Sequence, residues 1–279
     1  MRTGFAKTAA LVLCTSSAIT SGVPPWATAR DYTLTADIRY SDGARHVLDV
    51  YVPSNVDGAV RPVVVFFYGG GWETGRRGRY RFVANALTRE NFVAVVPDYR
   101  VYPDAVFPGF IVDAAKAVRW TKDHIAHFGG DPRRIFVMGH SAGAHIAAML
   151  ALDAQYLKSV GMTRAELRGM IGLAGPYTIL PLAPERREII FGPERERWRA
   201  QPINFVDGRN PPMLLLTGAE DTTVPPSDTH RLAAEIQTHH GPVTVIEYAR
   251  TGHADLLTDI AAARNGSVRR AIAKFVREH

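Results

Sequence analysis

A serine lies between two glycines in the sequence GHSAG, which occupies residues 139–143. The apolar run IFVM precedes it, and a run of small residues with helical character, residues 142–152, follows the serine. A serine on a tight turn from strand to helix holds its hydroxyl clear of the sheet, and the flanking glycines allow neighbouring backbone to approach closely. These features predict that Ser141 is a nucleophile.

Attack by a serine hydroxyl requires a base, and the base requires an acid that orients it. The expected chain order is serine, acid, histidine. Asp221 follows a strand-like segment, residues 212–218, and His253 follows another, residues 242–248. Loops at the carboxyl ends of parallel strands form the sites of such sheets. We therefore predict that His253 is the general base and that Asp221 orients it.

Neighbouring acidic and histidine residues offer alternatives to this assignment. Glu220 immediately precedes Asp221 and is a second candidate for the acid. His140 and His145 flank the serine too closely in sequence to accept its proton. We expect both histidines to be packing or hydrogen-bonding groups.

The sequence YGGGW, residues 68–72, follows the first strongly apolar strand-like run. Attack on a carbonyl develops negative charge on its oxygen, and one well-placed donor stabilises the transition state by roughly 3 to 4 kcal/mol. Glycines expose their N–H groups with no side chain in the way. We predict that the N–H groups of Gly69, Gly70 and Ala142 form the oxyanion hole.

Short apolar segments alternate with longer helical patterns along residues 31–279, as in a parallel sheet covered by helices. The expected strands are residues 46–52, 62–68, 92–97, 134–139, 167–174, 212–218 and 242–248. The expected helices are residues 79–90, 109–128, 142–152, 227–240 and a last one ending near residue 279. We predict an α/β fold with a mostly parallel central sheet, helices on both faces and one catalytic domain, residues 30–279.

Residues 175–210 interrupt this alternation with five prolines and no strong strand pattern. A connection of this length inside a compact domain is usually functional, and we predict a short lid insertion over the site. Arginine and glutamate are interspersed along residues 185–199. That pattern is typical of a solvated helix face. A second interpretation is that one or two of the arginines lean over the pocket and attract an anionic leaving group or acyl chain.

The N-terminal region has the features of a secretory signal. Arg2 and Lys7 precede an apolar stretch, and the sequence ATA at residues 27–29 has the small-x-small pattern of a cleavage site. We predict a signal peptide, residues 1–29, and a secreted or periplasmic protein with no stable membrane insertion after cleavage. An uncleaved anchor and a lipid-modified Cys14 are the alternatives.

Composition excludes several function classes. The 279 residues carry a formal net charge of +6 that is spread along the chain, which does not favour a nucleic-acid partner. A single cysteine, Cys14, excludes a disulfide framework and a cysteine-based metal or redox site. The pattern His-Glu-x-x-His is absent, and no Gly-Lys-Ser/Thr follows the glycines at residues 69–75. We therefore predict no metal and no other cofactor.

These motifs in this order resemble the α/β-hydrolase superfamily, and within it the esterase branch similar to hormone-sensitive lipase and bacterial feruloyl-esterase-like carboxylesterases. The segments VPDYR, residues 96–100, and FGGDP, residues 128–132, add to the resemblance, which extends from about residue 31 to the C-terminus. It implies an α/β-hydrolase fold, and it implies an architectural role for Asp98. Many members have His-Gly-Gly-Gly where this chain has Tyr68, so other groups must make the hydrogen bonds that shape this loop.

We therefore predict a serine carboxylesterase that hydrolyses small to medium acyl esters through an acyl-enzyme intermediate. The partner is a small-molecule ester, and water completes the cycle. An arylformamidase-type amidase resembling kynurenine formamidase is the alternative enzyme. A non-catalytic binding protein on a hydrolase scaffold is the alternative from another class. The acyl group, the alcohol and the oligomeric state stay open.

Overall fold

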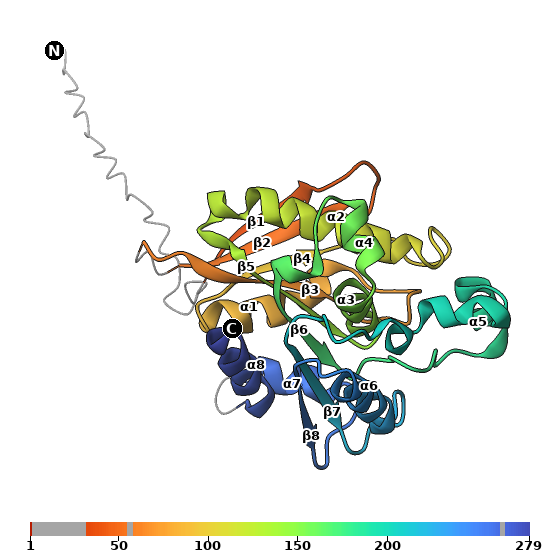
Figure 1. Ribbon diagram of the computed structural model, residues 1–279. Helices are drawn as coiled ribbons and strands as arrows, with labels where there is room; N and C mark the ends of the chain where they lie inside the picture. The colour runs from red at the N-terminus through yellow and green to blue at the C-terminus, as the bar shows by residue number, and fades with distance from the viewer. Residues whose placement is uncertain (2–31, 55–57, 263–265) are drawn as a thin grey trace. The chain divides into compact units, whose positions relative to one another are not determined.

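The computed structural model describes Met1 and residues 32–54, 58–262 and 266–279 (Figure 1). Residues 2–29 of the predicted signal peptide lie outside this described part. From residue 32 onward, eight strands form one sheet in the order β1-β2-β4-β3-β5-β6-β7-β8. Strand pairing is parallel from β4 to β8, while β1 and β2 are antiparallel to their neighbours. The predicted mostly parallel α/β architecture is confirmed.

The strands arise where the sequence is rich in β-branched and aromatic residues, which suit a pleated and buried surface. Their bounds are β1 (Tyr32–Arg39), β2 (Val47–Pro53), β3 (Arg61–Phe67), β4 (Val93–Pro97), β5 (Gly130–His140), β6 (Leu167–Leu173), β7 (Met213–Gly218) and β8 (Val243–Tyr248). Every residue of β3 and β4 is buried, as expected for central strands that are covered on both faces. These two strands therefore form the middle of the hydrophobic core.

Strand β1 was not among the expected strands. Its sequence YTLTADIR contains no continuous apolar run, and most of its residues are exposed or half-buried. It pairs with β2 only, at one edge of the sheet, with an irregularity between Thr35 and Ile38. Edge strands bury little surface and commonly carry polar residues and bulges, so an apolar pattern does not reveal this one.

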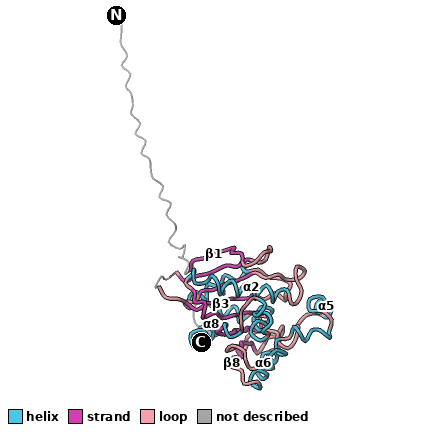
Figure 2. Tube along the Cα trace, turned by 45° about the horizontal axis from the view of Figure 1, so that its top comes forward, coloured by secondary structure: helices cyan, strands magenta, loops and turns pink. Residues whose placement is uncertain are grey.

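Helices lie on both sides of the sheet (Figures 1 and 2). Their bounds are α1 (Arg81–Arg89), α2 (Gly109–His124), α3 (Ala142–Leu152), α4 (Ala154–Ser159), α5 (Pro184–Phe191), α6 (Pro226–Thr238), α7 (Asp255–Ala261) and α8 (Ser267–Glu278). Helices α1, α7 and α8 contact one another, and α2, α3 and α4 form a second group. In the part of the chain that the structure describes, no helix has the length and apolarity needed to cross a membrane.

The predicted last helix, ending near residue 279, is confirmed as α8, but two short helices were not expected. One is α7, which ends at Ala261 before α8 begins at Ser267. The other is α4, which begins where the Asp153 side chain accepts a hydrogen bond from the N–H of Gln155. That side-chain cap lies next to the end of α3, which made the two helices hard to separate in the sequence.

The insertion, residues 175–210, contains α5 and two 3-10 helices, Glu194–Ala200 and Pro202–Phe205. It is anchored at several points. Buried Asp228 in α6 accepts hydrogen bonds from the N–H groups of Tyr177 and Thr178, and the Ile190 carbonyl accepts from the N–H of Phe107 at 2.8 Å. Ile190 is 0% exposed, whereas Ile189 is 47% exposed. One side of α5 therefore joins the main core and the other faces outward.

Candidate active site

Ser141 occupies a strained backbone position between β5 and α3. Its φ is 55° and its ψ is −124°, a combination that residues other than glycine rarely adopt. Its N–H donates to the carbonyl of Leu173 in β6 at 2.9 Å, and its own carbonyl accepts from the N–H of Ala144 in α3 at 2.9 Å. These bonds hold the turn on both sides, and the predicted strand-turn-helix context is confirmed.

The two glycines of GHSAG are required by close backbone contacts. A Cβ atom at Gly139 would lie 2.1 Å from the carbonyl oxygen of Gly143. A Cβ atom at Gly143 would lie 2.0 Å from the carbonyl oxygen of Phe67, at the end of β3. Both neighbouring atoms belong to the backbone and cannot move aside cheaply. Glycine is therefore required at residue 139 where the chain passes α3, and at residue 143 where α3 passes the end of β3.

Asp221 and His253 meet in a direct hydrogen bond. The Nδ1 atom of His253 lies 2.7 Å from Oδ2 of Asp221, whose side chain is 0% exposed. The other carboxylate oxygen accepts from the N–H groups of Thr223 at 2.8 Å and Val224 at 2.9 Å. When Nδ1 donates its proton in this hydrogen bond, Nε2 of a neutral His253 ring carries no proton and is an acceptor. A general base requires this state.

The loops that carry these two residues are joined side by side because β7 and β8 are adjacent, with Gly218 opposite Tyr248. The N–H of Glu220 donates to the carbonyl of Thr251 at 3.0 Å, while the Glu220 residue is exposed. The structure thus brings Asp221, and not Glu220, to the His253 ring.

A cavity of about 390 Å³ joins the remaining predicted site residues. Ser141, His253, Gly69 and Gly70 all line it. Ala142 is 1% exposed and occupies the first position of α3, where a helix leaves its N–H without an intrahelical partner. Pro181 and Leu182 of the predicted lid also line it, and further walls come from Tyr80, Thr223, Ala254 and Leu257.

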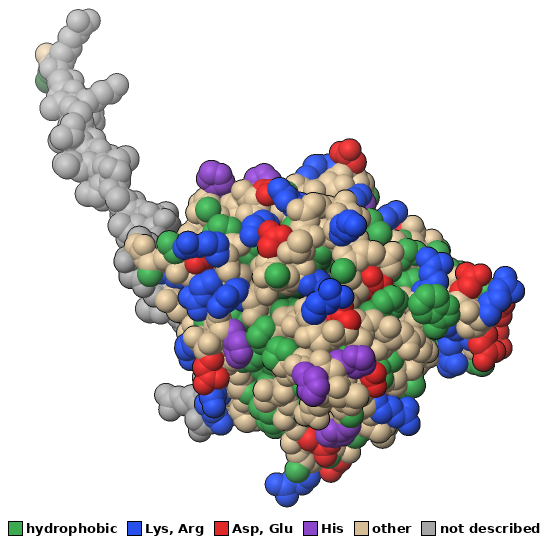
Figure 3. Space-filling view, in the orientation of Figure 1, with side chains coloured by type: hydrophobic (Ala, Val, Ile, Leu, Met, Phe, Trp, Pro, Cys, Tyr) green, Lys and Arg blue, Asp and Glu red, His purple; other side chains and the backbone are tan. Residues whose placement is uncertain are grey.

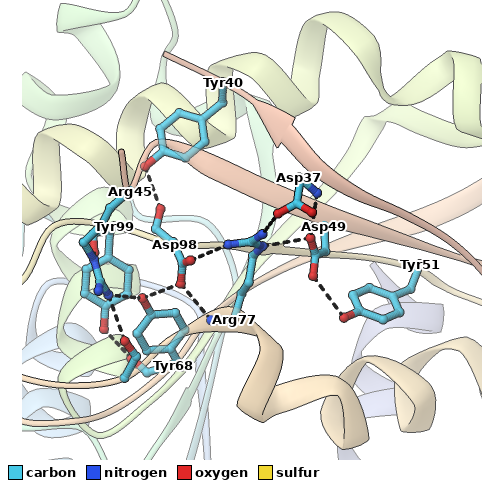
Figure 4. A network of polar contacts seen from close by, with 10 residues as sticks. Asp37, Tyr40, Arg45, Asp49, Tyr51, Tyr68, Arg77, Asp98 and Tyr99 are labelled. Atoms are coloured by element: carbon cyan, nitrogen blue, oxygen red, sulfur yellow. Dashed lines mark hydrogen bonds and ion pairs between the residues drawn. The ribbon is translucent and has the colours of Figure 1, made fainter. Parts of the chain in front are cut away.

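A buried polar network fixes the position of the glycine loop, residues 68–72 (Figure 4). The Tyr68 hydroxyl donates to Oδ1 of Asp98 at 2.8 Å and accepts from Nη2 of Arg45 at 2.9 Å. Arg45 also donates to the carbonyl of Gly75 at 2.8 Å, and the Tyr99 hydroxyl donates to the carbonyl of Tyr68 at 2.5 Å. Tyr68 at the start of the glycine loop and Gly75 just beyond its end are therefore both fixed by side chains from outside the loop.

Arg77 completes this network on the far side of Asp98. Its Nη1 lies 2.5 Å from Oδ2 of Asp98, its Nε lies 2.8 Å from Oδ1 of Asp49, and its Nη2 pairs with Asp37 (Figure 4). Asp98 and Asp49 are 6% and 2% exposed, and a buried carboxylate is tolerated only when it is paired and hydrogen-bonded. Asp98 thus reaches the glycine loop through Tyr68, in keeping with the architectural role that the resemblance implies.

Replacing Tyr68 with phenylalanine should loosen the glycine loop. The change leaves Asp98 and Arg45 without one buried partner each, and we expect a loss of about 1 to 3 kcal/mol in the free energy of unfolding. Displaced N–H donors should lower kcat by about tenfold with little change in KM. The matched control is Tyr40→Phe, because the Tyr40 hydroxyl donates to the Asp98 carbonyl at 2.7 Å without touching the loop. Equal losses of kcat in the two variants would contradict the role given to Tyr68.

His140 lies against His253 and bonds to the backbone of that residue. Its Nε2 donates to the carbonyl of His253 at 2.9 Å, and the two ring centres are 4.7 Å apart. Its Nδ1 edge faces Gly69. Burial, and secondarily the nearby His253, lowers the pKa of His140 to about 4. His140 is therefore a neutral group that positions the loop of His253, as a hydrogen-bonding residue and not as the base.

His145 connects α3, the helix that follows Ser141, with two other parts of the site. Its Nε2 donates to the carbonyl of Ala200 in the insertion at 2.7 Å, and its Nδ1 accepts from the indole N–H of Trp72 at 3.3 Å. The ring is 0% exposed, and burial lowers the pKa of His145 to about 4. A neutral imidazole with both nitrogens bonded is the only state that this location accommodates.

The two buried histidines should make the fold sensitive to acid. The pKa values of His140 and His145 are lowered to about 4, from 6.5, so between these two pH values the unfolded chain binds more protons than the folded one. The free energy of unfolding should therefore fall as the pH decreases through this window, by roughly 3 kcal/mol per histidine. Urea unfolding between pH 7.5 and 4.5 measures this slope.

A matched pair of variants separates these histidines from the other titrating groups. His145→Leu should be less stable at pH 7.5, because Trp72 and Ala200 lose a partner, but its stability should fall less steeply with acid. His127→Gln removes an exposed histidine and should keep the slope of the unchanged protein. An unaltered slope in His145→Leu would contradict the assignment.

Sequence reasoning could not find the supporting residues of the site. Arg45 and Arg77 belong to no motif, and they contact Tyr68 and Asp98 only because the chain folds back on itself. Thr223 and Ala254 could be found only through their closeness in sequence to the acid and the histidine. Leu182 could be found only as part of the predicted lid, and Tyr80 gave no signal at all.

Comparisons with known proteins agree with this fold. The family model described as BD-FAE matches residues 48–236. Isoprenylcysteine alpha-carbonyl methylesterase of Arabidopsis thaliana is 30% identical over 241 residues, which cover 78% of this chain and 56% of that protein. Esterase LipC of Mycobacterium tuberculosis is 29% identical over 268 residues, which cover 89% and 66%. The chain thus spans a little over half the length of the first of these relatives.

Solved structures of esterases share the architecture. A truncated carbohydrate esterase from gut microbiota superposes with a TM-score of 0.78 at 20% identity and covers 89% of this chain and 97% of that one. Esterase B of Lactobacillus rhamnosis superposes with a TM-score of 0.76 at 20% identity and covers 89% and 85%. Together with the family match and the strand order described above, these similarities show that the chain belongs to the BD-FAE family and has the α/β-hydrolase fold.

Proposed function

We propose that this chain is a serine carboxylesterase that hydrolyses small to medium acyl esters through an acyl-enzyme intermediate. The observation that carries the proposal is one cavity lined by Ser141, His253 and the glycines of YGGGW, with His253 bonded to the buried carboxylate of Asp221. The esterase relatives support the class of reaction.

The reaction needs these groups, the ester and one water molecule. The Ser141 hydroxyl oxygen attacks the ester carbonyl while His253 Nε2 takes its proton, and the N–H groups of Gly69, Gly70 and Ala142 bind the oxyanion. Collapse of this intermediate breaks the ester C–O bond, and His253 returns the proton to the leaving alcohol. Water then attacks the acyl-enzyme in the same way, which releases the acid and restores Ser141.

The dimensions of the cavity favour small and medium substrates. Its volume of about 390 Å³ lies near the lower end of the range for small-molecule sites. The insertion contributes Pro181 and Leu182 to the wall, so residues 175–210 act as a cap that shapes the acyl or alcohol pocket. Its anchoring to α6 and α3 supports a cap that stays in place rather than a swinging lid.

A series of 4-nitrophenyl esters from acetate to palmitate tests the proposal. We expect kcat/KM to be highest for acyl chains of about two to eight carbons and at least tenfold lower for palmitate. Formanilide and methyl ferulate belong in the same series. Faster cleavage of the formamide would favour the amidase alternative, and no turnover of any substrate would favour a non-catalytic binding protein.

Export is part of the same proposal. Residues 1–29 act as a signal peptide, and the mature enzyme works in a secreted or periplasmic location. The charged start, the apolar stretch and the ATA sequence support this. Expression of the full chain in a bacterial host, followed by N-terminal sequencing of the exported protein, should give Arg30 as the first residue. Retention in the membrane fraction with Met1 intact would contradict cleavage.

A further inference from the structure

A second cavity, of about 570 Å³, lies within the insertion. Pro181 lines both this cavity and the one that contains Ser141, so the two adjoin at that residue. Figure 3 shows basic and acidic side chains gathered at the end of the molecule where Figure 1 labels α5. Part of that charged segment forms the walls of this second cavity.

Three of its lining side chains determine what the cavity can bind: Arg187, Arg197 and Trp198. Arg187 donates from Nη2 to the carbonyl of Leu182 at 2.7 Å, and Arg197 donates from Nε to the carbonyl of Gly192 at 2.9 Å. These backbone bonds fix each guanidinium with a single contact, so further N–H groups of both side chains stay available.

Neither of these two arginines has an acidic ion-pair partner in the part of the chain that the structure describes. Arg186 and Arg195 on the same insertion do form ion pairs. The Nε atom of Arg187 is buried and lacks a hydrogen-bond partner among the residues that the structure describes. One carboxylate, Glu194, also lines the cavity. Two positive charges against one negative charge leave a site that favours an anion.

The apolar part of the cavity suits the carbon skeleton that carries such an anion. The Trp198 residue is 56% exposed, and its ring stacks on Phe205 with ring centres 6.3 Å apart. Leu180, which is 5% exposed, and Pro181 continue this surface toward the Ser141 cavity. A ligand can therefore place its reacting ester at Ser141 and extend along an apolar wall toward the two arginines.

We propose that this second cavity is a carboxylate-binding subsite, in which Arg187 and Arg197 select esters that carry a free carboxylate remote from the bond that is cleaved. The inference rests on the proposed function, because the ester must react at Ser141. A planar guanidinium matches the two oxygens of a carboxylate, and a partly desolvated pair of this kind is stronger than a neutral hydrogen bond. The carboxylate can belong to the acyl part or to the alcohol part of the substrate.

Three pairs of substrates, in two arms, distinguish these sources. For the acyl part, 4-nitrophenyl hydrogen adipate and suberate are compared with the same esters whose free carboxylate is replaced by a carboxamide. For the alcohol part, 4-carboxyphenyl butyrate is compared with 4-carbamoylphenyl butyrate. The carboxamide has nearly the same shape without the charge. We expect a kcat/KM for the carboxylate member about tenfold or more above that of the carboxamide member, in one of the two arms.

The variants then assign this preference to the second cavity. The preference is the ratio of kcat/KM for the carboxylate ester to kcat/KM for the matching carboxamide ester. Arg187→Gln, Arg197→Gln and the double variant should lower this ratio toward one, mainly by raising KM for the carboxylate ester. The matched control is Arg195→Gln. Arg195 lies in the same 3-10 helix as Arg197 and carries the same charge, but it is exposed and pairs with Glu196, so this variant should keep the preference. Glu194→Gln removes the opposing carboxylate and should strengthen the preference. Because Arg197 is only half-buried, Arg197→Gln keeps the test available if Arg187→Gln impairs folding.

Two results would overturn the subsite: no preference for the carboxylate in either arm, or an equal loss of preference in Arg195→Gln. Turnover of the carboxamide esters by the unchanged protein reports the proposed esterase function separately. A protein that cleaves the carboxamide esters without preferring the carboxylates would thus remain an esterase, but it would lack this subsite.

Discussion

Ser141→Ala should abolish ester hydrolysis, with kcat reduced by about 10⁵-fold or more, because no other group can form the acyl-enzyme. The same variant should lose labelling by a fluorophosphonate probe, which reacts with activated serines. The free energy of unfolding should change by less than about 0.5 kcal/mol, since alanine meets the same backbone strain at this position and no buried side-chain bond is lost.

Ser227→Ala, at an exposed residue in α6, is the control and should keep both activity and labelling. Continued labelling of Ser141→Ala at another serine would show that the nucleophile lies elsewhere. A protein that binds esters but never labels, even before substitution, would be a binding protein on this scaffold.

Asp221→Asn has the second largest expected effect, a decrease of about 10³- to 10⁴-fold in kcat. Asparagine can still accept from the N–H groups of Thr223 and Val224 through its oxygen, so the fold should persist. Its amide nitrogen would then face His253 Nδ1 as a donor, which places the ring proton on Nε2. A ring in that tautomer cannot accept the proton of Ser141.

Glu220→Gln is the matched control, because it changes the adjacent acid in the same loop. Its exposed side chain should leave kcat within about threefold of the unchanged protein. Steady-state kinetics with one 4-nitrophenyl ester suffices for both variants. An equal or larger loss in Glu220→Gln would reverse the roles of the two acids.

Seven of the eight strands could be predicted from the sequence, because the central strands are buried on both faces and read as apolar runs and the edge strand β8 is rich in β-branched residues. The strand β1 could not, because an edge strand that is mostly exposed carries no such run. The position of Ser141 was also predictable, since the glycines of GHSAG and the small residues of α3 are local requirements of one turn. The sequence favoured Asp221 over the adjacent Glu220, but which of the two meets His253 depends on the direction that the turn gives each side chain.

The groups that surround the reacting atoms depend on the tertiary structure alone. Arg45, Arg77 and Asp98 reach Tyr68 through contacts between residues 21 to 30 positions apart, and such contacts leave no periodic pattern in a sequence. The insertion was visible as a break in the pattern, but only folding showed that Arg187 and Arg197 line a cavity while Arg186 and Arg195 pair elsewhere. The sequence thus determined the fold and the reactive motifs, because both follow from local patterning and burial. The support of the glycine loop, residues 68–72, and the shape of the pockets were decided by long-range packing, which brings together residues that share no local signal.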